Sequence, residues 1–440
     1  MTQFPSTILA EIQDYRQTLA TLLIYGGSVE DEVGQAFVAL LDAVAGQSTT
    51  ESLRAYSLWF QALATTQETW SSYLQRRIAY ADNPFTQQVQ RHGLGDIAPA
   101  LEQAARHDLA LLQRLHALSS RQVADWIQVV GGLDRAPVAW DTLPAPLPFT
   151  FAADLAWPDQ LEALVAHYQR HGVGPLAQYQ VFTWQHGDLR GVAHPDPVRL
   201  DTLTAYDHPR QQLRQNTLAL LRGYPALNVL LYGSRGSGKS SLVKALVNEY
   251  GPQGLRLIEV PKPALTDLPQ IVNRLRHAPQ KFIVFVDDLS FEEDDEAFKA
   301  LKVVLEGSVT ARPQNLVVYA TSNRRHLVRE YFSDRPRPSD QDEVQAWDTV
   351  QEKLSFSDRF GLTLTFEPAD QSTYLAIVYH LAQQAHLALP PDELTARSLQ
   401  WATRHNGRSG RTARQFIDWI TAEQSPEAEP PSAGKAEGKP

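Results

Sequence analysis

Apolar side chains in roughly the first 125 residues recur at spacings of three and four, as in Leu109, Leu112 and Leu115. This spacing places them on one face of a helix. The same pattern between residues 51 and 81 includes several tryptophans and tyrosines, which we interpret as core residues. We therefore predict a mostly helical amino-terminal domain over residues 1–136.

The pattern changes after residue 202, where short continuous apolar runs alternate with helical stretches. Continuous Val, Ile, Leu and Phe runs separated by helices are typical of a parallel sheet covered on both faces. We predict a three-layer α/β/α domain over residues 196–367. Its five parallel strands are expected at residues 228–232, 255–260, 282–286, 316–320 and 362–366.

Three further helical stretches follow the last strand and predict a helical domain over residues 368–423. The tail, residues 424–440, is rich in Pro, Glu, Ala, Gly and Lys and is expected to be disordered. Residues 137–195 combine a Pro-rich stretch with a short hairpin pattern, so we predict a linker and small accessory segment there. His186 and Asp188 in the turn of that hairpin are interpreted as structural.

Composition sets limits on the kind of protein. The chain is 43% hydrophobic and 20% charged, as in ordinary soluble globular proteins, and it has no cysteine, which excludes disulfides and thiolate metal sites. Neither a signal-peptide pattern nor an apolar run of about 18–20 residues is present. We expect a cytoplasmic protein that does not associate with membranes.

The formal net charge of −10 does not indicate broad electrostatic binding to nucleic acid. Two basic segments, residues 324–326 and 404–414, would allow local contact with DNA, but the overall charge argues against it.

A phosphate-binding loop is the first chemical motif. Residues 233–240 satisfy G-x-x-x-x-G-K-[ST], after a predicted strand and before a predicted helix. Glycines allow backbone N–H groups to turn toward phosphate oxygens, and the following helix presents its positive end to the same anion. The pattern predicts binding of ATP and Mg²⁺, with a lysine for the β- and γ-phosphates and a serine hydroxyl for the metal. The nucleotide-binding candidates are Gly233, Ser234, Arg235, Gly236, Ser237, Gly238, Lys239, Ser240 and Ser241.

Two acids end the strand at residues 282–286. Asp287 is predicted to hold Mg²⁺ together with Ser240, and Asp288 to polarise the attacking water as a general base. Five further acids at residues 292–296 are interpreted as the solvent-facing start of a helix, where they match its dipole.

Later polar residues complete the candidate site. Asn323 ends the fourth strand, where it can hydrogen-bond the γ-phosphate or the attacking water. Arg359 precedes the fifth strand, and Arg411 and Arg414 begin the last helix. Arginines near a phosphate neutralise transition-state charge, although the pattern alone makes these ordinary surface residues.

The order of these motifs resembles that of the AAA+ ATPases over about residues 195–423. The runs NVLLYGSRGSGKSSLVKAL, FVDDLSFEE, VLEGS, YATSNRRHL and SDRFGL look more closely like a bacterial AAA+ family catalogued only as a domain of unknown function. The resemblance implies an ATP-hydrolysing P-loop domain, with residues 368–423 as its helical lid. It also implies that the protein assembles with other copies of itself as a homo-oligomer.

The resemblance also implies roles for individual residues. Lys239, Ser240 and Asp287 match the Walker A lysine and serine and the Walker B aspartate, and Asn323 resembles sensor 1. Arg359 resembles an arginine finger that completes a neighbouring subunit's site. Arg414 most resembles the sensor 2 arginine, with Arg411 as the alternative, and Asp207 and His208 fall where related proteins contact adenine.

Asp288 departs from the family pattern, because most AAA+ remodelling enzymes have Glu there. Its shorter side chain sets the carboxylate back by about 1.5 Å, and a misplacement of about 1 Å can cost on the order of 100-fold in rate. We therefore weigh three functions: an ATPase that remodels or regulates an unidentified macromolecular partner, an ATP-dependent adaptor or switch with negligible turnover, and a helicase-loader-like protein.

Overall fold

The computed structural model describes residues 6–142, 146–290, 296–306, 313–323, 359–405 and 407–424. The chain divides into two compact units, one of Met1–Tyr179 with His277–Gln280 and the other of Gln180–Arg276 with Lys281–Pro440. Among the sequence-derived candidates, the acids at 292–295, the basic residues at 324–326 and the tail from 425 lie outside the described residues.

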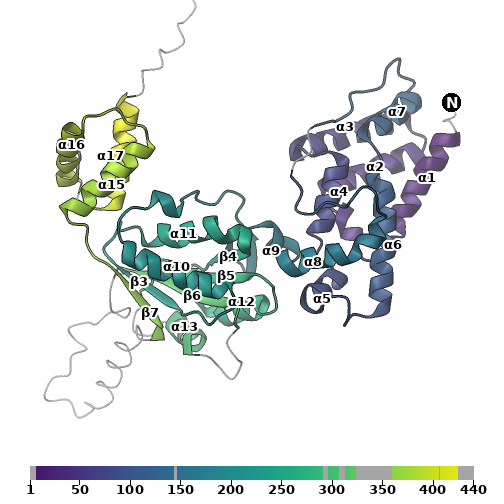
Figure 1. The fold of residues 1–440 in the computed structure, drawn as a ribbon. Coiled ribbons are helices and arrows are strands. Elements are labelled where there is room, and N and C mark those ends of the chain that lie inside the picture. The colour runs from purple at the N-terminus through teal and green to yellow at the C-terminus, as the bar shows by residue number, and fades with distance from the viewer. Residues whose placement is uncertain are drawn as a thin grey trace, which may run out of the picture. The chain divides into compact units, whose positions relative to one another are not determined.

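The first unit is built from helices, which confirms the predicted helical amino-terminal domain (Figure 1). The 3₁₀ turns η1 (Gly26–Val29) and η2 (Trp157–Gln160) connect some of them. The helices are α1 (Ser6–Ala20), α2 (Glu32–Ala45), α3 (Thr49–Thr66), α4 (Trp70–Ala79), α5 (Pro84–His92), α6 (Pro99–His116), α7 (Ser120–Gly131), α8 (Leu161–His171) and α9 (Gly174–Gln178).

Aromatic side chains form the centre of this unit's core, as their helical spacing predicted. Trp59 and Trp70 are buried, and the rings of Trp70 and Tyr73 stack with centroids 5.5 Å apart. Phe37 from α2 lies 4.2 Å from Trp70 by ring centroid. Because large rings bury much apolar area, this cluster stabilises the packing of α2, α3 and α4.

The segment predicted as linker and accessory contributes to both units. Its residues 146–179, with α8 and α9, belong to the helical unit. Its hairpin is confirmed: β1 (Val181–Gln185) and β2 (Asp188–Gly191) pair antiparallel, and His186 and Gly187 form the turn. Asp188 accepts a hydrogen bond from Arg274 at 2.6 Å, so it has a structural partner as expected.

The second unit contains a sheet in the order β2-β1-β4-β5-β6-β3-β7. All neighbouring strands are parallel except β1 and β2. The predicted α/β fold class is confirmed, but the described sheet has seven strands instead of five, because β1 pairs with β4 and extends the sheet by a hairpin. The five predicted strands are β3 (Val229–Gly233), β4 (Leu255–Glu259), β5 (Lys281–Val286), β6 (Leu316–Ser322) and β7 (Leu362–Phe366).

Helices lie on both sides of this sheet (Figure 1). α10 (Asp207–Leu221) and α11 (Lys239–Tyr250) share one hydrophobic core with alternate residues of the central strands. α12 (Leu268–Leu275) and α13 (Glu296–Glu306) lie on the opposite side, and η3 (Leu200–Thr202), η4 (Gly251–Gln253) and η5 (Lys262–Asp267) are short connections.

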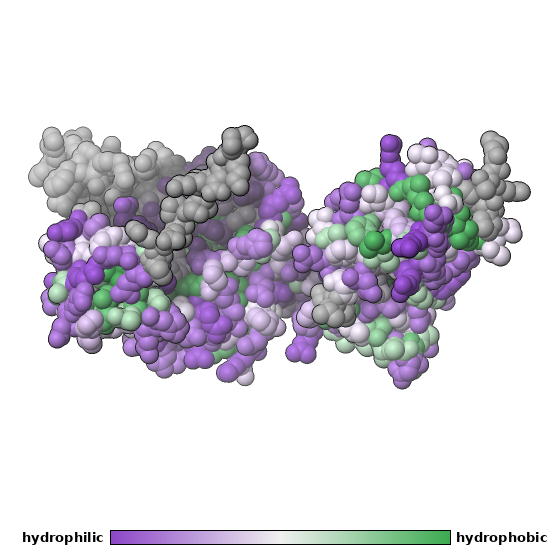
Figure 2. Space-filling view, turned by 90° about the horizontal axis from the view of Figure 1, so that it is seen from above, coloured by the Kyte–Doolittle hydropathy of each residue, from purple (hydrophilic) through white to green (hydrophobic). Residues whose placement is uncertain are grey.

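The predicted helical lid is a three-helix group with its own core (Figure 1). It consists of α15 (Gln371–Gln384), α16 (Pro391–Arg404) and α17 (Gly410–Gln424). The face of each unit seen in Figure 2 is mostly hydrophilic, with smaller hydrophobic areas between. None of the helices in the described part of the chain has the length and apolar character needed to cross a membrane.

His167 makes the helical unit sensitive to pH. Burial, together with the nearby charge of His171, lowers the pKa of His167 to about 4, and a backbone hydrogen bond at Ala79 opposes this shift only in part. The unfolded chain therefore binds more protons than the folded chain between pH 6.5 and about 4. The free energy of unfolding should fall by about 3 kcal/mol as the pH decreases through this window.

We expect His167→Gln, which does not titrate, to lose this part of the pH dependence. Urea unfolding of wild type and variant, followed by the tryptophan fluorescence of the helical unit at pH 7.5, 6 and 5, measures it. The stability of the wild type should fall more steeply toward low pH than that of the variant, and an identical pH dependence would contradict the assignment.

Candidate nucleotide-binding site

The phosphate loop connects β3 to α11 and depends on glycine at defined points. Gly233 has φ +147°, and a Cβ there would lie 2.0 Å from the carbonyl oxygen of Phe366 at the end of β7. Gly236 and Gly238 have φ of +75° and +87°, which side chains rarely allow. The loop therefore turns tightly against the neighbouring strand and leads directly into the first turn of α11.

Lys239 is the buried cation of this loop, with 6% of its surface exposed. Its ammonium donates to the carbonyls of Gly233 at 3.0 Å and Ser234 at 2.8 Å, and to Asn323 Oδ1 at 3.3 Å. Burial lowers the pKa of Lys239, while the charges of Asp287 and Asp288 raise it. The loop thus holds a positive group that could pair with a bound phosphate.

Ser240 and Asp287 come together as the sequence predicted, because β5, β6 and β3 are neighbours whose carboxyl ends share one edge. The Ser240 hydroxyl donates to Asp287 Oδ1 at 2.6 Å. Hydroxyl and carboxylate oxygens are ligands that Mg²⁺ prefers. No cluster of three or more His, Asp or Glu able to hold a metal occurs among the described residues. Mg²⁺ would therefore depend on these two oxygens together with phosphate and water.

Asp288 and Asn323 form the next pair at this edge. Asn323 Nδ2 donates to Asp288 Oδ1 at 2.7 Å, while Asn323 Oδ1 accepts from Lys239. Asp288 adopts φ +50°, the left-handed region that Asp and Asn tolerate better than most residues. The acid is thus joined through Asn323 to the cation of the phosphate loop.

A pocket of about 660 Å³ opens over these groups, within the size range of small-molecule sites. Its polar floor is the phosphate loop with Asp287, Asp288 and Asn323. An apolar wall, which the sequence analysis missed, comes from three separate stretches of chain and offers a surface for a flat ring: Val198, Leu203, Tyr206, Phe366, Ile377 and Leu381.

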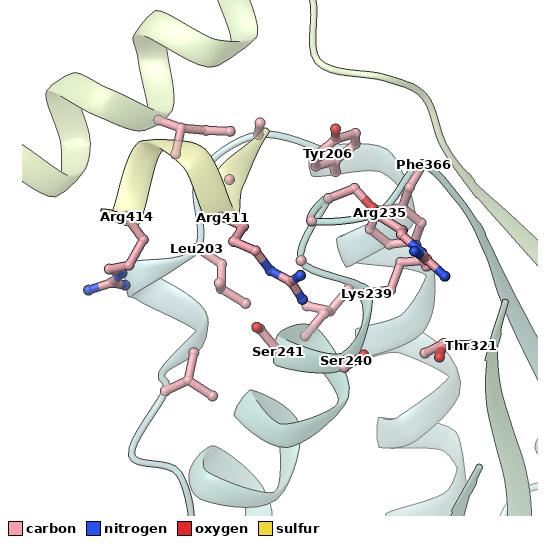
Figure 3. A pocket seen from close by; sticks show the side chains of 18 of the residues that line it. Leu203, Tyr206, Arg235, Lys239, Ser240, Ser241, Thr321, Phe366, Arg411 and Arg414 are labelled. Atoms are coloured by element: carbon pink, nitrogen blue, oxygen red, sulfur yellow. The ribbon is translucent and has the colours of Figure 1, made fainter. Parts of the chain in front are cut away.

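The lid contributes Arg411 and Arg414, which both line the pocket. Figure 3 shows Arg411 extending toward the start of α11, while Arg414, one turn further along α17, points away to the side. The Arg411 N–H also donates to the carbonyl of Gly236 at 3.3 Å, so the lid touches the phosphate loop directly. Of the two arginines, Arg411 is the better placed to meet a phosphate.

The other predicted nucleotide contacts lie around this centre. Arg235, Ser237 and Ser241 line the pocket, and Figure 3 shows Arg235 on the side of Lys239 that faces Phe366. Asp207 and His208 do not line it. They are the exposed first residues of α10, where Asp207 pairs with Arg210, and the residues just before them, 202–206, form the pocket wall instead.

Arg359 lies at the opposite end of β7 from the phosphate loop. It precedes Leu362, the first residue of β7, whereas Phe366, the last, meets Gly233. At about 3.3 Å per residue, five strand residues separate the two ends by roughly 15 Å. Arg359 is not among the residues that line the pocket of its own chain.

Solved structures similar to this chain include RuvB of Thermotoga maritima, described as a Holliday junction branch migration motor. It is 14% identical over 51% of this chain and 72% of that chain, with a TM-score of 0.33. AMPPCP-bound DnaA of Aquifex aeolicus is 17% identical over 53% of this chain and 68% of that chain, with a TM-score of 0.37. No curated protein matches the chain.

A family model matches residues 177–424, more than half of the chain, and covers the sheet, the phosphate loop and the lid. These are the elements on which the resemblance to the AAA+ ATPases rests. The chain belongs to the family described as "Protein of unknown function (DUF815)".

Proposed function

We propose that this protein binds Mg-ATP and hydrolyses it as an AAA+ ATPase, coupling the nucleotide cycle to an unidentified macromolecular partner. The observation that carries the proposal is the hydrogen-bonded group of Lys239, Ser240, Asp287, Asp288 and Asn323 beneath one pocket. This group combines a cation that can bind phosphate, two ligands for the metal and a carboxylate that can activate the attacking water.

Each residue has a definite role in this proposal. The phosphate loop and Lys239 bind the β- and γ-phosphates, and Ser240 and Asp287 hold Mg²⁺, which offsets phosphate charge when bound. Asp288 orients water and accepts its proton, while Asn323 positions Asp288. The apolar wall takes the base, and Arg411, or Arg414 after a lid movement, contacts phosphate.

The leading alternative is a switch whose ATP-dependent binding is its output, with negligible turnover. It is favoured by Asp288, which is shorter than the usual Glu. Neither the ATPase nor the switch requires nucleic acid, and the net charge of −10 makes a helicase-loader role the least favoured of the three.

Nucleotide binding should depend on the Lys239 ammonium. We expect Lys239→Ala to weaken ATP binding by about 10- to 100-fold, because a charge-assisted contact to phosphate is lost. Lys244→Ala, one turn further along α11 and outside the pocket, is the matched control and should bind as wild type does. Titration with a fluorescent ATP analogue measures both. Equal affinities in the two variants would remove Lys239 from the site.

Turnover should depend on the Asp288 carboxylate. Asp288→Asn keeps the shape of the side chain but cannot accept the proton, so kcat should fall by about 100-fold or more while ATP affinity stays within about 3-fold. A steady-state phosphate-release assay with parallel binding titrations tests this. If wild type binds ATP but turns over no faster than the Asn variant, the switch replaces the enzyme as the favoured function.

Arg359 should act on a neighbouring copy of the chain, since it lies far from its own pocket. Arg359→Ala alone should lose about 1000-fold in kcat, as expected for an arginine finger. Mixing it with Lys239→Ala should restore part of the activity, because one subunit then supplies the arginine and the other the phosphate loop. A mixture that co-assembles yet stays inactive would argue against a shared site. Arg222→Ala, an exposed arginine of the same unit, serves as control.

A further inference from the structure

Thr321 occupies a position that the roles above do not use. It is the next-to-last residue of β6, and only 2% of its surface is exposed. Val286 of β5 pairs with Ala320 of β6. The residues that follow these two in the chain, Asp287 and Thr321, therefore lie side by side. In the view of Figure 3, Thr321 appears on the side of Ser240 that is away from Ser241.

Thr321 bonds three consecutive residues of the acidic segment. Its hydroxyl donates to Asp287 Oδ1 and accepts from the backbone N–H of Asp288 at 2.9 Å. Its carbonyl accepts from the N–H of Leu289 at 2.7 Å. A hydroxyl has a single proton to donate, and here Asp287 receives it. The side chain therefore connects the metal-side carboxylate directly to the backbone that carries the second acid.

The backbone of Asp288 requires such support. Its φ of +50° is uncommon for a residue with a side chain and persists where neighbouring contacts hold it. Thr321 holds the N–H of Asp288, and Asn323 donates to its carboxylate at 2.7 Å. Two residues at the end of β6 therefore hold Asp288: Thr321 holds its backbone and Asn323 holds its carboxylate.

We propose that Thr321 is a positioning residue that holds Asp287 and Asp288 in one fixed relation, so that the metal site and the water-activating carboxylate are aligned together. This inference rests on the proposed ATPase site. In it, Thr321 keeps the short side chain of Asp288 aligned with the metal site. Misalignment of about 1 Å can cost on the order of 100-fold in rate, so loss of the hydroxyl should act mainly on kcat.

A purely structural hydroxyl would behave differently. It would satisfy buried polar groups at the end of a strand, and its removal would lower stability without a selective effect on the site. Thr217 is such a case in the same unit: it is fully buried, donates to the carbonyl of Leu213 at 2.9 Å and bonds the Tyr319 hydroxyl at 2.9 Å. Thr217→Val is therefore the matched control.

The test compares Thr321→Val, Thr321→Ser and Thr217→Val in the full-length protein. Valine keeps the β-branched shape suited to a strand and removes only the hydroxyl, while serine keeps the hydroxyl. We expect Thr321→Val to lower kcat by about 10- to 100-fold with KM changed less than about 3-fold, and Thr321→Ser to recover most of kcat. Thr217→Val should lose thermal stability but keep both constants.

A second readout does not depend on turnover. The affinity for a fluorescent ATP analogue is measured with Mg²⁺ and with EDTA, and their ratio reports the metal contribution. Thr321→Val should reduce this ratio by about 2- to 3-fold and leave the affinity in EDTA unchanged, because the disturbed Asp287 contributes to binding only through the metal. Wild-type values for kcat and for the ratio in Thr321→Val would overturn the positioning role.

The two proposals fail in distinguishable ways. A wild-type protein that binds ATP without turnover overturns the enzymatic function, while the Mg²⁺ ratio still decides for or against Thr321. A Thr321→Ser variant as impaired as Thr321→Val also overturns the role of the hydroxyl, even when the wild type is fully active.

Discussion

The site depends on the shared carboxyl edge of three neighbouring parallel strands. β6 lies between β5 and β3, so the acids after β5, the polar end of β6 and the phosphate loop after β3 must meet. Parallel pairing makes this unavoidable, because every strand ends at the same edge. The hydrogen bonds from Ser240 to Asp287 and from Lys239 to Asn323 then join the three strand ends into one group.

Contacts from more distant parts of the chain hold the phosphate loop in place. The carbonyl of Phe366 leaves no room for a side chain at Gly233, and the start of α17 donates to the carbonyl of Gly236. The loop is therefore packed between the last strand and the lid. A change at the lid can reach the phosphate loop through this backbone contact, as the proposed coupling of nucleotide to a partner would require.

Asp288 shows how a local departure can be accommodated by its surroundings. Asp288 combines a shorter acid with a left-handed backbone conformation, and contacts with Thr321 and Asn323 hold its N–H and its carboxylate. The sequence alone indicated slower hydrolysis. The structure adds the hydrogen bonds on which the proposed alignment of this acid rests.

The sequence by itself determined the helical and α/β regions, five strands near their observed positions, the lid helices and the phosphate loop with its acids, because these follow from local periodicity and fixed spacing. Only the tertiary structure decided that a hairpin extends the sheet, that residues 202–206 instead of Asp207 and His208 wall the pocket, and that Arg411 points inward. It also revealed Thr321. These features arise from strand register and from packing between segments far apart in the chain, which no local pattern encodes.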